Sequence, residues 1–238
     1  MSTPEPMKLV TLPGVFAPIS DSWMLADAVR QEVVPGRTAL DVCTGSGVVA
    51  LSAAERGAVT TAVDVSRRAL LAVRLNALRS GLRIRTLRGR MFAPVAGERF
   101  DVIASNPPYV PSPRPDVPRR GASRAWEAGP DGRLVVDALC DAAPAHLRPG
   151  GVLLLVHSSL IGIEATLDRL RQAGLVDVEV RSCVRGPLGP LMRAQQAAGT
   201  IPADVDEEDV VVIRACAPLS HPASGFGVPG RRVDRGWR

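Results

Sequence analysis

Two polar corners of the sequence, each placed directly after an apolar run, hold the residues best suited to chemistry. One corner is Asn106-Pro107-Pro108-Tyr109, which follows the apolar run at 100–105. Two adjacent prolines oppose both a continued sheet ladder and a helix, so the chain must turn stiffly there. In open α/β sheets, ligands bind beyond the carboxyl ends of the strands. This rigid corner is therefore the first candidate for contact with a ligand.

The second corner is rich in glycine and lies at residues 41–47, where the apolar run 38–43 ends. Its glycines allow the backbone to approach a ligand closely. Asp64 lies near the end of the next apolar run. Its separation in sequence from the glycine-rich corner is about that of the acidic residue that holds ribose hydroxyls in dinucleotide-binding folds. The full dinucleotide fingerprint is absent, because Ala50 stands at the third glycine position. The pattern indicates an adenosine-containing ligand, with a plain strand-to-helix turn as the open alternative.

The elements that must position these corners alternate along the chain. Apolar runs predict strands at 38–43, 59–65, 100–105, 151–157, 175–183 and 208–217, and an alternating apolar pattern predicts one at 83–89. Apolar residues at helical spacing predict helices at 48–57, 67–80, 131–147 and 164–174. Ser66 is a suitable N-cap for the second of these, and Pro144 should break or end the third. Strands that alternate with helices predict an α/β fold with a doubly wound, mostly parallel, seven-stranded sheet.

The last two predicted strands differ from the others because no helix is predicted between them. The intervening segment 184–209 is irregular and contains Gly and Pro, so we expect an antiparallel hairpin at the sheet edge. We expect one domain over residues 1–217. Residues 218–238 are rich in Gly, Pro and Arg and predict a basic, disordered tail. A solvated end without a role is the favoured interpretation of this tail, and contact with RNA or an acidic partner is the alternative.

Composition limits the classes of function. Hydrophobic residues make up 46% of the chain and aromatic residues only 3%, so the core must be aliphatic and a broad surface for stacking single-stranded bases is disfavoured. The formal net charge of +5 keeps nucleic acid among the candidate partners. The four cysteines and three histidines show no metal-ligand spacing, so no metal is expected. Neither a signal peptide nor a membrane-spanning run is recognisable, which predicts a cytoplasmic protein.

Three stretches resemble the class I S-adenosylmethionine-dependent methyltransferases with an N-P-P-Y motif: LDVCTGSGVVAL at 40–51, AVDVS at 62–66 and SNPPYV at 105–110. Such enzymes act on planar nitrogens, either the exocyclic amine of adenine or the side-chain amide of glutamine. The resemblance implies a Rossmann-like fold and S-adenosylmethionine as the methyl donor. It assigns donor binding to Asp41, Thr44, Gly45, Gly47, Asp64 and Asn106.

The resemblance also implies how the N-P-P-Y corner works. A planar nitrogen is a poor nucleophile because its lone pair is delocalised, and its two N–H donors need two acceptors. The Asn106 side-chain oxygen and the Pro107 backbone carbonyl supply them, holding the nitrogen in line with the methyl group. Tyr109 packs against the flat face of the acceptor group. Asn106, Pro107 and Tyr109 are thus the predicted catalytic residues.

Two flanking segments, at 14–29 and 124–139, resemble the HemK/PrmC glutamine methyltransferases. They are closer to the short eukaryotic and archaeal branch, which has no separate N-terminal helical domain. This resemblance favours a glutamine in a protein as the methyl acceptor, such as that of a translation release factor, and implies a small activating partner protein. A methyltransferase of adenine in DNA or RNA, a small-molecule methyltransferase and a non-catalytic cofactor-binding protein stay open as alternatives.

The sequence departs from the family pattern at two positions and contains one unusual loop. Arg90 stands where an acidic residue that contacts the adenine amine of the cofactor is expected, and a guanidinium cannot accept a hydrogen bond. Cys43 replaces the first glycine of the family's loop. The proline-rich, basic segment 111–124 is interpreted either as a lid that grips the substrate or as a solvated loop.

Overall fold

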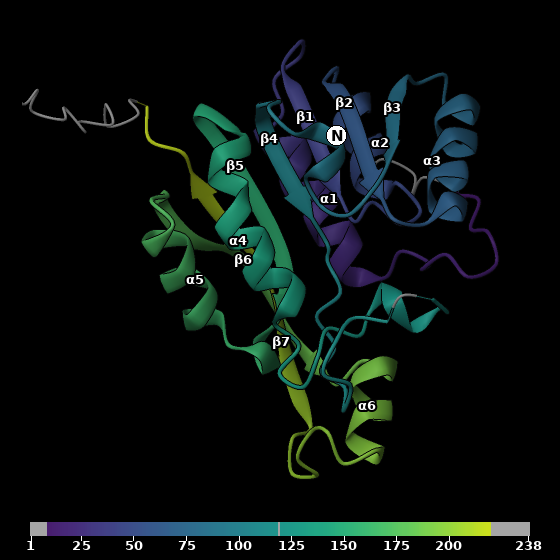
Figure 1. The fold of residues 1–238 in the computed structure, drawn as a ribbon, viewed down its shortest axis with the longest axis vertical. Helices are drawn as coiled ribbons and strands as arrows, with labels where there is room; N and C mark the ends of the chain where they lie inside the picture. Colours follow the sequence, from purple (N-terminus) through teal and green to yellow (C-terminus); the bar gives the residue numbers. More distant parts are fainter. Residues whose placement is uncertain (1–8, 119, 220–238) are drawn as a thin grey trace, which may run out of the picture.

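A computed structural model describes residues 9–118 and 120–219 of the chain. The strands form a sheet with the order β3-β2-β1-β4-β5-β7-β6, drawn as arrows in Figure 1. They are β1 Thr38–Val42, β2 Val59–Asp64, β3 Ile84–Arg88, β4 Phe100–Ser105, β5 Leu147–Ser158, β6 Val176–Pro187 and β7 Glu207–Cys216. Strands β1 to β5 pair in parallel, and β7 pairs antiparallel with both β5 and β6. The predicted seven-stranded, mostly parallel sheet with an antiparallel edge hairpin is confirmed.

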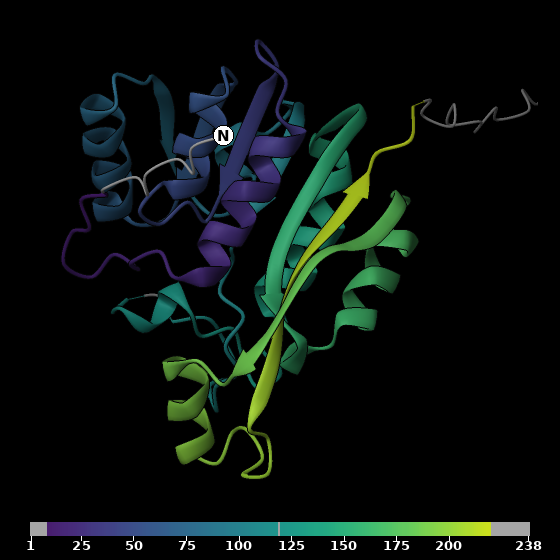
Figure 2. The same ribbon diagram turned by 180° about the vertical axis from the view of Figure 1, so that it is seen from behind.

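Helices cover both faces of this sheet, as a doubly wound fold requires. One face carries α1 Ser20–Glu32, α2 Val48–Glu55 and α3 Arg67–Arg79, and the other carries α4 Leu134–His146 and α5 Ile163–Gln172. Figure 2 shows α1 in front of the sheet in the view from behind, whereas α4 and α5 lie in front in Figure 1. Short 3-10 turns are found at η1 Ala93–Val95, η2 Ser123–Ala125 and η3 Ser159–Ile161.

The core is aliphatic and lies in two layers, one on each side of the sheet. Along β4, Ile103 packs into the layer under α4 and α5, whereas Val102 and Ala104 pack into the layer under α1 and α2. This alternation follows from the two-residue period of a strand. Because both faces of the central strands β1 and β4 are covered, their sequences are nearly continuous apolar runs, and this is why these strands could be predicted.

Two helices go beyond the sequence expectation. The segment 184–209, for which the sequence predicts no helix, contains α6, Pro190–Ala197. Proline is favourable in the first turn of a helix, but eight residues are too few for a clear apolar period. The other is α1, whose buried residues, among them Leu25 and Val29, pack against the sheet. The predicted end of a helix near Pro144 agrees with α4, which passes through this proline and ends at His146.

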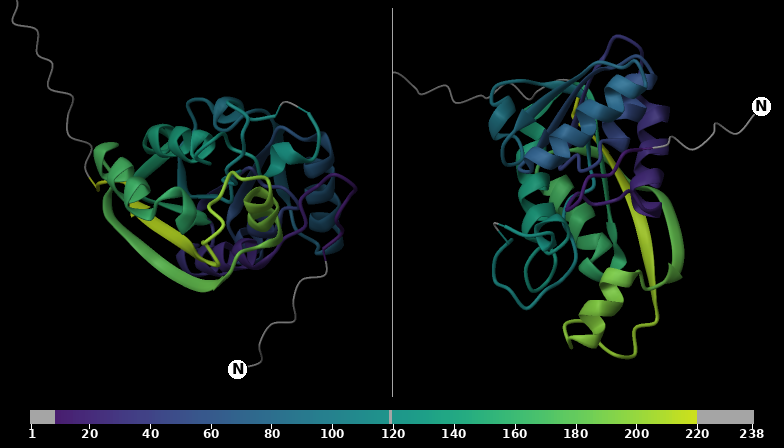
Figure 3. Two further views of the ribbon diagram at one scale, coloured as in Figure 1. Left: turned by 90° about the horizontal axis from the view of Figure 1, so that it is seen from below. Right: turned by 90° about the vertical axis from the view of Figure 1, so that its right-hand side faces the viewer.

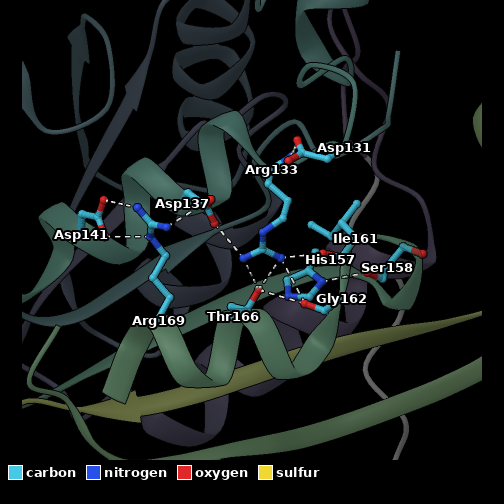
Figure 4. Close-up of polar contacts among 10 residues, drawn as sticks. All are labelled: Asp131, Arg133, Asp137, Asp141, His157, Ser158, Ile161, Gly162, Thr166 and Arg169. Atoms are coloured by element: carbon cyan, nitrogen blue, oxygen red, sulfur yellow. Dashed lines mark hydrogen bonds and ion pairs between the residues drawn. The ribbon is translucent and has the colours of Figure 1, made fainter. Parts of the chain in front are cut away.

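A polar network joins the start of α4 to the start of α5 (Figure 4). The Arg133 guanidinium donates to the carbonyls of Ile161 and Gly162 and pairs with Asp137. Asp137 in turn pairs with Arg169. The neighbouring His157 is fully buried, and burial lowers its pKa to about 4, so it is a neutral structural residue. The network fixes the segment before α4, which contacts the candidate site.

No helix within residues 9–118 and 120–219 is both long and apolar enough to cross a membrane. The domain boundary expected after residue 217 stays a prediction. Most of the expected tail, residues 220–238, lies outside the described residues.

Candidate active site

The site forms where the strand order reverses, between the carboxyl ends of β1 and β4. Val42 at the end of β1 is in register with Ser105 at the end of β4, and the Ser105 hydroxyl donates to the Val42 carbonyl at 2.7 Å. A cavity of about 380 Å³, called the central cavity below, opens at this point. It is lined by most of the predicted site residues: Asp41, Thr44, Gly45, Asp64, Asn106, Pro107 and Tyr109.

Asp41 is buried at one end of the central cavity. Its Oδ2 accepts hydrogen bonds from the Thr44 hydroxyl at 2.6 Å and from the Ala50 backbone N–H at 3.0 Å. Burial raises the pKa of this carboxyl to about 7. Thr44 therefore braces the glycine loop through Asp41, and the carboxylate has no cation beside it to stabilise its charge within the described residues.

Asp64 ties together the loops that follow β1 and β2. Its Oδ2 accepts from the Gly45 backbone N–H at 3.1 Å, and its Oδ1 accepts from the Ser66 backbone N–H at 2.7 Å. Burial raises the pKa of the Asp64 carboxyl as well. Two backbone donors thus hold the carboxylate at the cavity wall, where a ligand hydroxyl can reach it.

Gly47 does not line the central cavity, unlike the other predicted donor-binding residues. Its φ is +90°, and a Cβ on it would lie 2.8 Å from Val73 Cγ2, so glycine allows α2 to pack closely on α3. Cys43 has a φ of +62°, a conformation that costs about 1–2 kcal/mol for a residue with a Cβ. This conformation explains why glycine is expected at that position of the loop.

The N-P-P-Y corner is anchored by the first turn of α1. The Asn106 Nδ2 donates to the Ser22 hydroxyl at 3.0 Å, and that hydroxyl donates to Asp21 Oδ1 at 3.1 Å. The Tyr109 hydroxyl donates to the second oxygen of Asp21, Oδ2, at 2.8 Å. Asp21 and Ser22 are only 3% and 5% exposed. One carboxylate therefore orients both polar side chains of the motif.

This anchoring leaves two acceptors available. Because the Asn106 amide nitrogen is engaged by Ser22, the Asn106 Oδ1 is the side-chain atom left for a ligand. No donor among the described residues reaches the Oδ1 of Asn106 or the carbonyl of Pro107. The pKa of Tyr109 is raised well above its usual value by burial and then by the charge of Asp21. Tyr109 therefore keeps its proton and cannot act as a base.

The segment before α4 supports the backbone of the motif. The Val110 N–H donates to the Trp126 carbonyl at 2.7 Å, and the Ala128 N–H donates to the Val110 carbonyl at 3.0 Å. Gly132, with a φ of +72°, lies so close that a Cβ would be 2.4 Å from the Tyr109 carbonyl oxygen. Any larger residue at this position must displace the N-P-P-Y backbone.

The end of the central cavity beside Tyr109 has an apolar wall. This wall is formed by Leu191 and Met192 of α6 together with Trp126 and Phe16. The ring centroids of Phe16 and Trp126 are 6.5 Å apart. Figures 1 and 3 show α6 beside the loop that follows β4. α6 belongs to the segment 184–209, for which the sequence predicts no helix.

The loop 111–124 combines features of both interpretations made from the sequence. Val117, Pro118 and Arg124 line the central cavity, as a lid would, whereas residues 113–116 are exposed. Arg90 also lines the cavity and is exposed. It therefore lies at the cavity wall, at the position where an acidic residue is expected.

Sequence reasoning missed Asp21 and Ser22. They lie inside the segment 14–29 that carries part of the family resemblance, but neither their types nor their spacing marks them as site residues. Among the described residues, no group of three or more His, Cys, Asp or Glu side chains could hold a metal ion.

Comparison with known proteins defines the class. The Mtq2–Trm112 complex of E. cuniculi, responsible for the methylation of the eRF1 translation termination factor, matches with a TM-score of 0.60 and 23% identity, over 86% of this chain and 99% of that chain. At this identity the likeness shows the fold alone. The family described as "Methyltransferase small domain" matches residues 6–116. Fold and site together define a Rossmann-like, class I methyltransferase.

Sequence relatives narrow this class to a family. A putative protein N5-glutamine methyltransferase of Methanocaldococcus jannaschii is 30% identical over 189 residues, which cover 79% of this chain and 94% of the relative. A release factor glutamine methyltransferase of Geobacter sulfurreducens is 30% identical over 72% of this chain, but the match spans only 62% of that relative. The chain belongs to the protein glutamine methyltransferase family, and the predicted resemblance is confirmed.

Proposed function

We propose that this protein transfers a methyl group from S-adenosylmethionine to the side-chain amide nitrogen of a glutamine in a protein. The observation that carries the proposal is the pair of free acceptors at the N-P-P-Y corner, the Oδ1 of Asn106 and the carbonyl of Pro107. Both lie at the wall of the central cavity. A primary amide has two N–H donors, so this pair matches it in number and in polarity.

The residues of the central cavity fit the proposed donor. Asp41 is a buried carboxyl without a cationic partner, and the positive charge of S-adenosylmethionine would supply one. Asp64 can accept hydrogen bonds from ribose hydroxyls. A Cβ built on Gly45 meets nothing within 4 Å, so there is room for a ligand beside the loop. When bound, S-adenosylmethionine supplies a methyl group on a positively charged sulfur, which is a strong electrophile.

The protein's own contribution is positioning and electrostatics. The Asn106 oxygen and the Pro107 carbonyl accept the two amide protons, which fixes the nitrogen and favours its more electron-rich form. Pro107 and Pro108 make the backbone rigid, so the acceptors need little reorganisation. Tyr109, held by Asp21, presents its ring to the flat face of the amide. No side chain must act as a strong base, because the methylated nitrogen is acidic and loses its proton readily.

The family suggests the acceptor protein. The bacterial relative is named for release factors, and the structural neighbour for the methylation of a termination factor. We propose a glutamine of a translation release factor as the substrate, and the cytoplasm, where translation terminates, as the location. Residues 1–217 form the catalytic domain in this proposal.

A small partner protein is supported by one surface of the described structure. Leu71, Leu75 and Leu78 of α3 are 49%, 36% and 77% exposed. Their spacing places them on one side of the helix, next to the edge strand β3. The structural neighbour Mtq2 is found in a complex with Trm112. We propose that a partner covers this stripe, and full turnover by the isolated chain would argue against a requirement for it.

The proposal is tested by methyl transfer from radiolabelled S-adenosylmethionine. The chain is incubated with a release factor, with the same factor whose acceptor glutamine is changed, and separately with DNA and RNA. The proposal is supported if the release factor becomes labelled and the factor whose acceptor glutamine is changed does not. Label only in nucleic acid would instead assign an adenine amine as the acceptor. Donor binding without transfer to any of these acceptors would point to a small-molecule substrate or a non-catalytic role.

Two variants separate acceptor binding from donor binding. Asn106→Ala should abolish transfer while calorimetry shows nearly unchanged donor affinity. Asp64→Ala should weaken donor binding, because it removes the hydroxyl acceptor and also frees the N–H groups of Gly45 and Ser66. Normal turnover by Asn106→Ala would show that the mechanism is wrong.

A further inference from the structure

We propose that an arginine-lined hollow beside the central cavity binds the phosphate backbone of RNA. Five arginines surround this hollow, with only small or aliphatic residues between them: Arg67, Arg68, Arg88, Arg120 and Arg124. They come from the start of α3, the end of β3 and the loop around η2, three segments that are distant in the sequence. We call the hollow the arginine hollow.

The arginine hollow adjoins the proposed active site. Val65, Ser66, Gly14 and Arg124 line both the arginine hollow and the central cavity. A ligand in the hollow would therefore lie beside the part of the central cavity that contains Asp64. The hollow is on the side of the cavity where β2 ends, away from the apolar wall formed by α6.

Among the described residues, these arginines have no close carboxylate partners, and only a longer-range attraction joins Arg124 to Asp64, where it opposes the rise in the pKa of the carboxyl. Within residues 9–118 and 120–219, none of the five forms an ion pair with a carboxylate, in contrast to Arg133 or Arg185. The five positive charges equal the formal net charge of the whole chain, +5. Such a concentration of positive charge without close ion pairs attracts a ligand with several negative charges.

Two of the guanidinium groups are held in place by the backbone. Arg68 Nη1 donates to the Pro13 carbonyl at 3.2 Å, and Arg88 Nε donates to the Val65 carbonyl at 3.3 Å. Each uses one donor in this way, and the remaining N–H groups are available to a ligand. Guanidinium groups match the oxygens of a phosphate in two parallel hydrogen bonds. Among the described residues that line the hollow there is no aromatic ring on which a base could stack, so contacts to the RNA backbone rather than to bases are expected.

RNA fits this hollow better than an acidic protein segment does. This step rests on the proposed function. Release factors act on the ribosome, and proteins that contact RNA present Lys and Arg at the contact surface. The arginine hollow would repel such a basic surface of a release factor. RNA, in contrast, would be attracted both by that surface and by the arginine hollow. The hollow therefore suits RNA that accompanies the substrate rather than the substrate itself.

The test is binding of a fluorescently labelled RNA hairpin to the full-length chain, measured by anisotropy at several salt concentrations without a methyl donor. The double variant Arg67→Gln/Arg120→Gln should reduce the magnitude of the negative slope of the log binding constant against log salt concentration by about 1 to 2. Each lost phosphate contact removes about 0.7 to 0.9 of this magnitude. The matched control Arg79→Gln/Arg83→Gln removes the same charge from exposed arginines near the other end of α3. It should leave the slope unchanged.

The proposal is overturned if the two double variants show the same slope, if the wild-type chain does not bind the hairpin at low salt, or if poly-glutamate binds more tightly than RNA. This measurement is independent of methyl transfer. If RNA does not bind, the result of the methyl-transfer assay with the release factor is not affected. If methyl transfer to the glutamine fails, the salt dependence of RNA binding is not affected.

Discussion

Replacing Asp21 with Asn tests the idea that α1 positions the acceptor-binding residues. The change keeps the shape of the side chain but removes its charge and exchanges one acceptor oxygen for an NH₂ donor. Asp21 accepts hydrogen bonds from both Tyr109 and Ser22, at 2.8 and 3.1 Å. The substitution must disturb at least one of them, and with it the orientation of Tyr109 or Asn106.

The expected loss follows from the strength of these bonds. A hydrogen bond to a charged group contributes about 1.5–3 kcal/mol. If this energy serves to hold the acceptor geometry of the transition state, kcat falls about 10- to 150-fold, since each 1.36 kcal/mol corresponds to about tenfold in rate. The affinity for S-adenosylmethionine should change little, because Asp41 and Asp64 lie at the other corner. The control is Asp27→Asn, which changes a carboxylate of the same helix that is 68% exposed.

A spectroscopic measurement tests the contact itself. Tyr109 is the only tyrosine in the chain, so the near-ultraviolet absorbance of tyrosinate reports on this residue alone. Wild-type Tyr109 should titrate well above its ordinary pKa. In Asp21→Asn the titration should move to lower pH, because the negative charge that opposes ionisation is gone, while burial still keeps it above the ordinary value. A shifted titration with unchanged kcat would refute the positioning role, since the contact would then exist without a consequence for turnover.

Three further predictions concern the same site. The affinity for the positively charged donor should rise as pH increases through about 7, the pKa of Asp41, because only the ionised carboxyl attracts a cation; calorimetry should show this dependence in the wild type and its loss in Asp41→Asn. Gly132→Ala should lower kcat at least about tenfold with little change in donor affinity, because its Cβ would clash with the Tyr109 carbonyl; wild-type turnover would mean that the motif does not depend on this close contact. Cys43→Val should melt about 4–8 °C below Cys43→Gly, as expected for about 2 kcal/mol of backbone strain in a chain of this size; equal melting temperatures would show that the loop relaxes without cost.

Much of the fold and the two chemical corners of the site, the glycine loop and the N-P-P-Y corner, follow from local patterns in the sequence. The central strands are covered by helices on both faces, so each is a continuous apolar run that can be recognised without knowing its neighbours. The glycine loop and the N-P-P-Y corner follow such strands directly, and their place at the carboxyl edge of the sheet follows from the alternation of strands and helices. Asp41, Gly45, Asp64 and Asn106 could therefore be predicted as one cluster.

The rest depended on contacts between residues far apart in the chain. Asp21 and Ser22 are separated from Tyr109 and Asn106 by 88 and 84 positions, and no local period reports such a pairing. α6 is short and begins with proline, so its place in the cavity wall comes from packing rather than from helix propensity. The arginines of the arginine hollow are unremarkable singly, and only the fold brings them together. Sequence by itself determined the elements and the two chemical corners, because strand and helix periods and turn residues act locally. The tertiary structure alone decided which side chains orient those corners, because hydrogen bonds and charges act through space.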